Sequence, residues 1–258
     1  GGISGMQAAV TAAENGHDVV LCEKTGELGG TILCEKDVPF KSALHRFIEQ
    51  QKASLTKLGV EVRLNTPVDK ASAEAMKPDA VICAIGADVV KPPIPGIDLP
   101  QVHSAVEVFA KPEIAKGKIL ILGGGLAGSE LAIYLSSLGK DVTLVEMAPF
   151  LNDGGNSCHG IAVRDMLIQH KVPLNLGTKA EEITAEGVRC SNRQGEIFFP
   201  ADTVVYAAGM RAKKEEALSF YSAARSFHMV GDCVNSSTIL NATGTAYTVA
   251  RYLGRYGE

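Results

Sequence analysis

Residues 118–146 read KILILGGGLAGSELAIYLSSLGKDVTLVE, and this stretch decides the fold class. The apolar run at 119–122 is too short for a helix and is followed by glycines, which predicts a buried parallel strand. The apolar-periodic segment that ends at Gly139 predicts a helix, and residues 142–145 predict a second strand. Strand, GxGxxG turn, helix, strand and acidic residue therefore follow one another in the order of a dinucleotide-binding unit.

The turn and the acidic residue suggest how a nucleotide would bind. Gly123 permits a tight turn, Gly125 lets the backbone approach a pyrophosphate, and Gly128 allows close packing of helix and strand. The beginning of the helix offers free N–H groups and roughly half a positive charge to phosphate. Glu146, 18 residues after Gly128, can accept hydrogen bonds from ribose hydroxyls. The candidate nucleotide-binding residues of this stretch are Gly123, Gly125, Leu126, Ala127, Gly128 and Glu146.

The same unit recurs at the beginning of the chain, with matching residues at a constant offset of 123 positions. The matching residues are Gly2, Gly5, Gly16, Asp18, Val19, Leu21 and Glu23, which correspond to Gly125, Gly128, Gly139, Asp141, Val142, Leu144 and Glu146. The repeat predicts a second dinucleotide-binding fold, with Gly2, Ile3, Ser4 and Gly5 at the beginning of its helix. The counterparts of Gly123 and of the strand before it would precede Gly1. We therefore expect the first fold to lack its first strand, and the chain to be part of a longer protein.

Five further segments contribute candidate binding residues. Leu28-Gly29-Gly30 predicts a tight turn that leaves room for a phosphate. A buried strand at 79–84 ends near Gly86, and another at 203–208 ends at Gly209, 123 residues later. Residues 229–232 predict a short strand that delivers an aspartate, and a helix is expected from about Ala242 to the carboxyl end. Together with Lys24, which follows Glu23, these segments add the candidates Gly29, Gly30, Thr31, Ala84, Gly86, Gly209, Gly231, Asp232 and Thr243.

We therefore predict an α/β protein with two Rossmann-like, three-layer dinucleotide-binding folds. Because the carboxyl-terminal segment completes the first fold, the second fold is expected to be inserted within it. The prolines between 92 and 100 indicate a crossing between domains. The expected division is 1–96 for the first part of one domain, 97–205 for the other, and 206–258 for the remainder of the first. A helix is also predicted at 40–58, and antiparallel strands are predicted at 180–199.

Composition excludes several classes of protein and binding partner. Hydrophobic residues make up 46% of the chain and charged residues 21%, as in ordinary globular proteins. The net charge of -4 and the absence of a basic run argue against nucleic-acid and membrane partners. The six cysteines include no CxxC pair and no metal-ligand spacing, so we expect a reduced, cytoplasmic chain without a metal site. The sequence leaves open whether the chain forms a homo-oligomer.

These motifs resemble the two-dinucleotide-binding flavoproteins, the pyridine nucleotide oxidoreductases of the glutathione-reductase type. The resemblance covers essentially the whole chain. It is closer to the carboxyl-terminal module of the 2,4-dienoyl-CoA reductase, enoate reductase and trimethylamine dehydrogenase family. The motifs that look like this subgroup are Pro39-Phe40-Lys41, the segment GVEVRLN at 59–65, Gly209-Met210-Arg211 and Gly231-Asp232-Cys233.

The resemblance implies FAD on the first fold and NADH on the second. By family pattern, Glu23 would hold the FAD ribose, Asp232 the ribityl chain, and the last helix near Thr243 would face the flavin ring. Glu130 matches a glutamate that lies near the flavin–nicotinamide contact in relatives. An amino-terminal barrel with FMN and an iron–sulfur cluster precedes this module in that family. We would expect that barrel to accept the electrons, and we expect FAD retention to suffer when the first strand is missing.

The expected function is an FAD-dependent NADH oxidoreductase module that passes hydride to flavin and relays electrons to a centre elsewhere. Hydride transfer needs placement of the two cofactors and exclusion of water, so we nominate no catalytic residue. The alternative is a non-catalytic ADP- or NAD-binding domain that braces a larger flavoenzyme. A self-contained disulfide or peroxide reductase is disfavoured, because no two cysteines lie a few residues apart.

Overall fold

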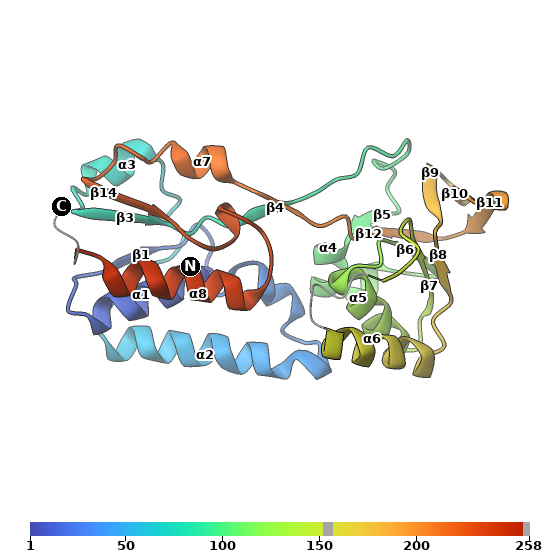
Figure 1. The fold of residues 1–258 in the computed structure, drawn as a ribbon, viewed down its shortest axis with the longest axis horizontal. Helices are drawn as coiled ribbons and strands as arrows, with labels where there is room; N and C mark the ends of the chain where they lie inside the picture. Colours follow the sequence, from blue (N-terminus) through green and yellow to red (C-terminus); the bar gives the residue numbers. More distant parts are fainter. Residues whose placement is uncertain (152–156, 255–258) are drawn as a thin grey trace. The chain divides into compact units, whose positions relative to one another are not determined.

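The computed structural model describes residues 1–151 and 157–254, which form two compact units (Figure 1). Unit 1 comprises Gly1–Asp88 and Met210–Glu258, and unit 2 comprises Val89–Gly209. The helices are α1 (Ile3–Glu14), α2 (Ser42–Lys57), α3 (Lys70–Ala75), α4 (Ala105–Ala110), α5 (Leu126–Ser137), α6 (Ser157–Gln169), α7 (Lys214–Leu218) and α8 (Ile239–Tyr252). Within the described part of the chain, none of these helices is long and apolar enough to cross a membrane.

The strands are distributed over both units. They are β1 (Val20–Cys22), β2 (Glu61–Arg63), β3 (Ala80–Cys83), β4 (Ala87–Val89), β5 (Val102–Ser104), β6 (Lys118–Leu122), β7 (Asp141–Glu146), β8 (Leu174–Leu176), β9 (Lys179–Thr184), β10 (Gly187–Asn192), β11 (Gly195–Pro200), β12 (Thr203–Tyr206), β13 (Met210–Ala212) and β14 (Ser226–Met229). Short 3-10 helices η1 to η4 span Gly30–Glu35, Pro39–Lys41, Pro112–Ile114 and Gly231–Cys233. The predicted α/β class is confirmed.

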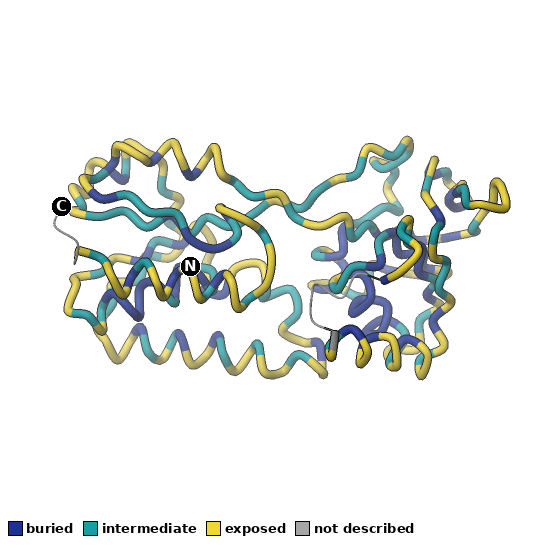
Figure 2. Tube along the Cα trace, in the orientation of Figure 1, coloured by how far each residue is buried: buried dark blue, intermediate teal, exposed yellow. Residues whose placement is uncertain are grey.

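Unit 2 is built on a five-stranded parallel sheet in the order β5-β12-β6-β7-β8. Alternate residues of β6 point to opposite faces, so both faces of this central strand must be covered. On one face, Leu120 and Leu122 join a buried cluster with Val188 and Cys190 of β10. The helix α5 packs against β6 and β7, and its central residues are buried (Figure 2). The antiparallel order β11-β10-β9 confirms the strands predicted at 180–199.

Unit 1 carries two separate parallel pairs, β1 with β2 and β3 with β14. The helix α1 packs against both α2 and α8, and Met6 and Ile48 lie in one of its buried clusters. At the offset of 123 residues, β1 and β3 correspond to β7 and β12, which flank β6 in unit 2. Among the described residues, no strand pairs with both β1 and β3. Val81 and Ile82 are consequently only half-buried, whereas their counterparts Val204 and Val205 are fully buried.

The chain passes between the units twice, through β4 and β13, which pair with each other. Val90 N–H donates to Gly209 O at 2.9 Å, just beyond the pair. The Lys213 ammonium lies 3.2 Å from the Asp88 carboxylate. The compact units divide at 88/89 and 209/210. The domain ranges 1–96, 97–205 and 206–258 stay a prediction.

The last helix begins earlier than the sequence suggested. α8 starts at Ile239, and the Oγ1 of Thr238 accepts a hydrogen bond from Asn241 N–H at 3.2 Å. The predicted start near Ala242 is therefore three residues too late. Threonine is a strong N-cap, but the preceding Ser236 and Ser237 are equally suitable in sequence, so the cap was ambiguous.

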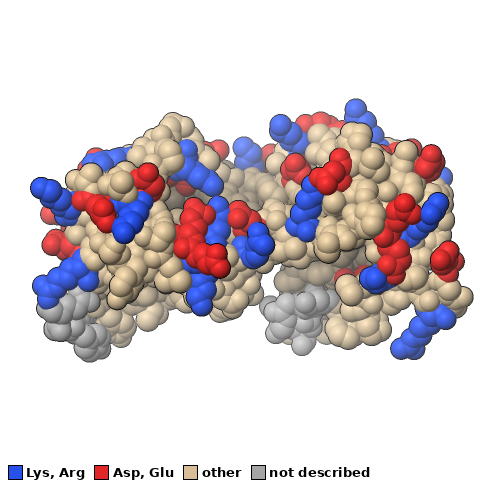
Figure 3. Space-filling model, turned by 90° about the horizontal axis from the view of Figure 1, so that it is seen from above, with Lys and Arg blue, Asp and Glu red and all other residues tan. Residues whose placement is uncertain are grey.

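Surface charge is mixed in sign. In the view of Figure 3, lysines and arginines lie among aspartates and glutamates and form no continuous field of one sign. Several opposite charges are paired, such as Lys52 with Glu49 at 2.9 Å and Arg189 with Glu182 at 2.9 Å. Exposed pairs of this kind contribute little to stability. This distribution agrees with the small net charge of -4.

Candidate nucleotide-binding sites

The glycines of the turn between β6 and α5 serve two different purposes. A Cβ atom added at Gly128 would lie 2.0 Å from Gly123 O and 3.1 Å from the Ala207 Cβ, so the fold itself requires glycine there. A Cβ added at Gly125 would meet no protein atom within 4 Å. Gly125 has an extended backbone, with φ -72° and ψ -179°, that any residue adopts. Its missing side chain therefore leaves open space beside the free N–H groups of α5, which fits the close approach of a pyrophosphate.

Glu146 ends β7 with its carboxylate held against this turn. Its Oε2 accepts a hydrogen bond from Gly124 N–H at 2.5 Å, and its Oε1 accepts one from Ala148 N–H at 2.6 Å. Two backbone donors thus fix the orientation of the carboxylate. Each carboxylate oxygen still has a free lone pair, so a ribose hydroxyl could donate to it.

Glu23 repeats this arrangement in unit 1. Its Oε2 lies 3.0 Å from Gly1 N, and its Oε1 accepts from Thr25 N–H at 2.7 Å. Gly1 and Thr25 correspond to Gly124 and Ala148 at the offset of 123 residues. Burial by itself raises the pKa of the Glu23 carboxyl. Hydrogen bonds from the Thr25 N–H and the Thr25 hydroxyl oppose this effect of burial.

A second glycine turn lies directly against the beginning of α1. Gly29 N–H donates to Gly1 O at 2.9 Å, and Gly2 and Gly29 form a parallel bridge. A Cβ added at Gly30 would lie 2.9 Å from the Gly2 Cα. The two backbones therefore approach as closely as only glycine permits. The structure thus brings the predicted Gly29-Gly30 turn to the predicted Gly2-Gly5 turn.

The segment after β14 also lies against the beginning of α1. A Cβ added at Gly231 would lie 2.1 Å from the Oγ of Ser4, and Gly231 N–H donates to the Thr245 Oγ1 at 3.0 Å. Asp232 follows in η4 and is half-buried. Burial raises the pKa of its carboxyl, and hydrogen bonds from Ser237 N–H and the Ser236 hydroxyl oppose this effect. Asp232 therefore lies in the segment that contacts the amino end of α1.

Other predicted residues are placed less tightly. A Cβ on Gly5 would lie 3.4 Å from the Ala84 Cβ, so Ala84 lies beside the first turn, whereas Gly86 follows β3. Lys24 and Thr31 are exposed. The Thr243 hydroxyl donates to Ile239 O at 2.9 Å, within its own helix. Ile3 and Ser4 begin α1, Leu126 and Ala127 begin α5, and Gly209 follows β12.

Sequence reasoning missed three residues that contact the predicted ones. Thr25 binds Glu23 through both its N–H and its hydroxyl, and Thr245 accepts from Gly231. Ala148 binds Glu146. The repeat could have paired Thr25 with Ala148, because they are 123 residues apart. No comparable sequence signal exists for Thr245.

Glu130, on the fingerprint helix α5, is held by a residue of α6. The Nε2 of His159 lies 3.0 Å from the Oε1 of Glu130. The Glu130 side chain is only 11% exposed, and the His159 side chain is 42% exposed. The helices α5 and α6 pack together, and this pair links their amino-terminal parts.

Two thiols of unit 1 have a raised pKa. Burial raises the pKa of the Cys34 thiol to about 12, and that of Cys83 also to about 12. These thiols stay protonated at neutral pH and are poor nucleophiles. The buried Cys233 Sγ donates to Cys83 O at 3.3 Å and to Val230 O at 3.1 Å. Among residues 1–151 and 157–254, no three His, Cys, Asp or Glu side chains gather as metal ligands.

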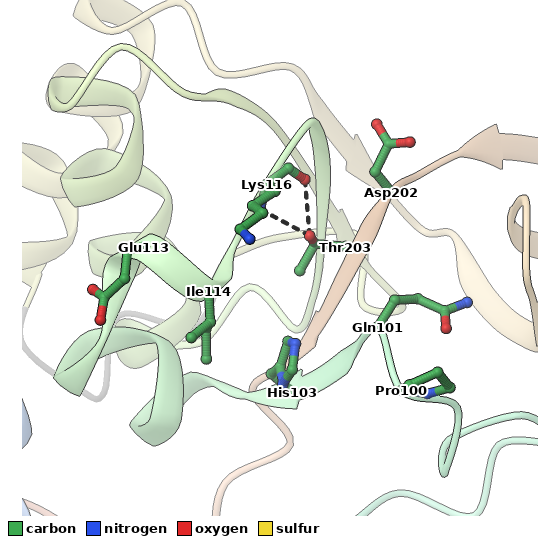
Figure 4. Close-up of a pocket in the computed structure, with 8 residues that line it drawn as sticks. All are labelled: Pro100, Gln101, His103, Glu113, Ile114, Lys116, Asp202 and Thr203. Carbon is green, nitrogen blue, oxygen red and sulfur yellow. Dashed lines mark hydrogen bonds between the residues drawn. The ribbon is translucent and has the colours of Figure 1, made fainter.

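A cavity of about 670 Å³ lies elsewhere on unit 2 (Figure 4). It is lined by Pro100, Gln101, His103, Glu113, Ile114, Lys116, Asp202 and Thr203. The Thr203 hydroxyl donates to Lys116 O at 2.8 Å and accepts from Lys116 N–H at 3.0 Å. These residues lie where β6 and β12 begin, whereas parallel α/β sheets bind nucleotides where the strands end. The cavity is therefore separate from the candidate nucleotide site.

A profile of the family described as "Pyridine nucleotide-disulphide oxidoreductase" matches residues 1–226. A bilirubin reductase from Mediterraneibacter gnavus is 34% identical over 254 residues, which cover 98% of this chain and 40% of that protein. An NADH oxidase from Thermoanaerobacter brockii is 33% identical over 263 residues, which cover 97% of this chain and 39% of that protein. The chain thus spans about two fifths of the length of these relatives.

A solved structure of 2-naphthoyl-CoA reductase in complex with 2-naphthoyl-CoA has the same fold, with a TM-score of 0.91. It is 28% identical in sequence, and the match covers 98% of this chain and 38% of that one. These similarities confirm the predicted resemblance to the flavin- and nucleotide-binding module of the enoate reductase family.

Proposed function

The chain belongs to the pyridine nucleotide-disulphide oxidoreductase family, and from this premise we propose that it is an NADH-dependent flavin oxidoreductase module. In this proposal unit 1 binds FAD and unit 2 binds NADH. The nicotinamide ring would supply hydride to the flavin ring when both are bound. The electrons would then pass to a redox centre outside these 258 residues.

One observation carries this proposal, namely the same carboxylate arrangement in both units. Glu23 and Glu146 each end a parallel strand, and each is held by two backbone nitrogen atoms beside a glycine turn. An acceptor fixed at this position suits the ribose of an adenosine diphosphate group, which FAD and NADH share. A chain with two such carboxylates fits a reaction between two bound dinucleotides better than a reaction that uses a single bound dinucleotide.

The residues of the chain would act by binding and positioning. Gly2 and Gly125 would let a pyrophosphate reach the amino ends of α1 and α5. Glu23 and Glu146 would orient the ribose rings, and Asp232 would hold the ribityl hydroxyls of FAD. No side chain is assigned to proton transfer in this reaction, because hydride transfer needs only placement and exclusion of water.

The route by which electrons leave is the part of the proposal that needs a separate experiment. We expect the FAD-loaded chain to reduce an artificial dye with NADH, and to fail on an enone or enoyl substrate. The reason is that no two of the six cysteines lie a few residues apart in the sequence, so the chain offers no neighbouring cysteine pair as an internal redox partner. NADH-dependent rates with both acceptors measure this, with the longer protein as the comparison. Equal rates of enone reduction by the chain and the longer protein would contradict the relay.

A further inference from the structure

In each unit a leucine packs on the glycine that lies beside the strand-end carboxylate. A Cβ atom added at Gly124 would lie 2.7 Å from the Leu151 Cδ2, 2.9 Å from the Glu146 Cβ and 3.0 Å from the Glu146 Cγ. The leucine and the stem of the glutamate therefore lie against the same side of Gly124. Leu151 itself is only 7% exposed. Its methyl groups thus keep solvent away from that side of the glycine.

Unit 1 repeats this contact. A Cβ added at Gly1 would lie 2.7 Å from the Leu28 Cδ2 and 2.7 Å from the Glu23 Cβ. Leu28 corresponds to Leu151 at the offset of 123 residues, and it is also 7% exposed. In unit 1 two glycines follow this leucine, whereas an asparagine and an aspartate follow it in unit 2. The leucine is common to both units although the next residues differ, so its role concerns the glycine and the carboxylate.

The hydrogen bond beside the leucine fixes the carboxylate of unit 2. Gly124 N–H donates to the Oε2 of Glu146 at 2.5 Å. Water at this place would compete for the N–H group and would raise the local permittivity. Because the side chain of Leu151 excludes water from Gly124, the hydrogen bond is strengthened and the carboxylate keeps its orientation.

We propose that Leu151 is a positioning residue for Glu146, and that it thereby strengthens the discrimination of unit 2 against NADPH. A carboxylate that is fixed and shielded from water repels an additional 2′-phosphate more strongly than a mobile, solvated carboxylate does. Leu28 has the corresponding role for Glu23. The inference rests on the proposed binding of NADH by unit 2. It adds a specificity determinant that the glycine fingerprint does not contain.

The test compares the dissociation constants of NADH and NADPH for the full 258-residue chain, measured by nucleotide fluorescence. We expect Leu151→Ala to reduce the ratio of the NADPH constant to the NADH constant at least about threefold, because the carboxylate can then turn away from the 2′-phosphate. Leu151→Val removes the contacting Cδ2 with a smaller loss of volume, and it should reduce the ratio in the same direction. In a Glu146→Ala background, Leu151→Ala should change the ratio by less than about twofold, because no carboxylate remains to be positioned.

Leu167→Ala is the matched control, because Leu167 is a fully buried leucine of α6 in the same unit. It should destabilise the chain and leave the ratio unchanged, and thermal unfolding identifies the variants that are folded. A purely structural leucine would affect both nucleotides by the same factor, so an unchanged ratio in the folded Leu151 variants would overturn the inference and leave the proposed function standing. An equally large reduction in the Glu146→Ala background would also overturn it. Absence of NADH binding by the wild type would overturn the proposed function and this inference together.

Discussion

Replacement of Gly125 by alanine is expected to weaken NADH binding about a hundredfold and to leave the free energy of unfolding nearly unchanged. The added Cβ meets no protein atom within 4 Å, and the extended backbone tolerates it. It would occupy the space through which a pyrophosphate reaches the amino end of α5. Loss of two charge-assisted hydrogen bonds, at about 1.5 kcal/mol or more each, corresponds to roughly this factor. Fluorescence titration with NADH and urea unfolding measure the two quantities.

Gly128→Ala provides the contrasting variant within the same turn. Its Cβ would lie 2.0 Å from Gly123 O, so the backbone has to move, at a cost of about 1–3 kcal/mol in unfolding free energy. Gly125→Ala should change stability by less than about 0.5 kcal/mol. A Gly125→Ala protein that binds NADH normally, or one that is as unstable as Gly128→Ala, would refute the assignment of Gly125 to ligand binding.

NADH is expected to bind unit 2 at least about tenfold more tightly than NADPH. The Glu146 carboxylate is fixed by Gly124 N–H and Ala148 N–H, so it cannot swing away from an additional 2′-phosphate. No lysine or arginine lies between Glu146 and Asn152 to balance this repulsion. Two like charges at ~4 Å with an effective permittivity near 20 repel by about 4 kcal/mol. A fraction of this energy is enough for a tenfold difference in affinity.

Two variants of Glu146 separate the contribution of charge from that of hydrogen bonding. Glu146→Gln removes the charge and keeps a hydrogen-bond acceptor, so it should reduce the preference for NADH over NADPH mainly by improving NADPH binding. Glu146→Ala should also reduce this preference, but mainly by weakening NADH binding. Glu186→Gln, an exposed carboxylate of the same unit, should change neither affinity. Equal dissociation constants of the wild type for NADH and NADPH would show that Glu146 does not face the ribose.

The parts of the fold that were predictable are encoded over short stretches of sequence. The strand at 118–122, the turn and the helix α5 follow from periodicity and glycine spacing within one segment. The acidic residues Glu23 and Glu146 follow from the 123-residue repeat. The repeat also predicted that no strand would lie between β1 and β3. Among the described residues, β1 pairs with β2 and β3 pairs with β14, in separate two-stranded sheets.

The parts that were not predictable depend on contacts between distant segments. His159 and Glu130 are 29 residues apart, on two helices whose packing determines whether they meet. The pairing of β4 with β13 joins residues more than a hundred positions apart. The start of α8 depended on a choice among adjacent capping residues that tertiary contacts make. Periodicity and motif spacing contain no information on such contacts.

The most direct test of the central claim is an anaerobic titration of the FAD-loaded chain with NADH. Visible absorbance reports reduction of the bound flavin, and nucleotide fluorescence reports binding of NADH in the same sample. We predict that stoichiometric NADH bleaches the flavin absorbance of the wild type, and that Gly125→Ala needs a large excess. If NADH binds and the flavin absorbance stays unchanged, the two units hold nucleotides without hydride transfer, and the proposed oxidoreductase function is contradicted.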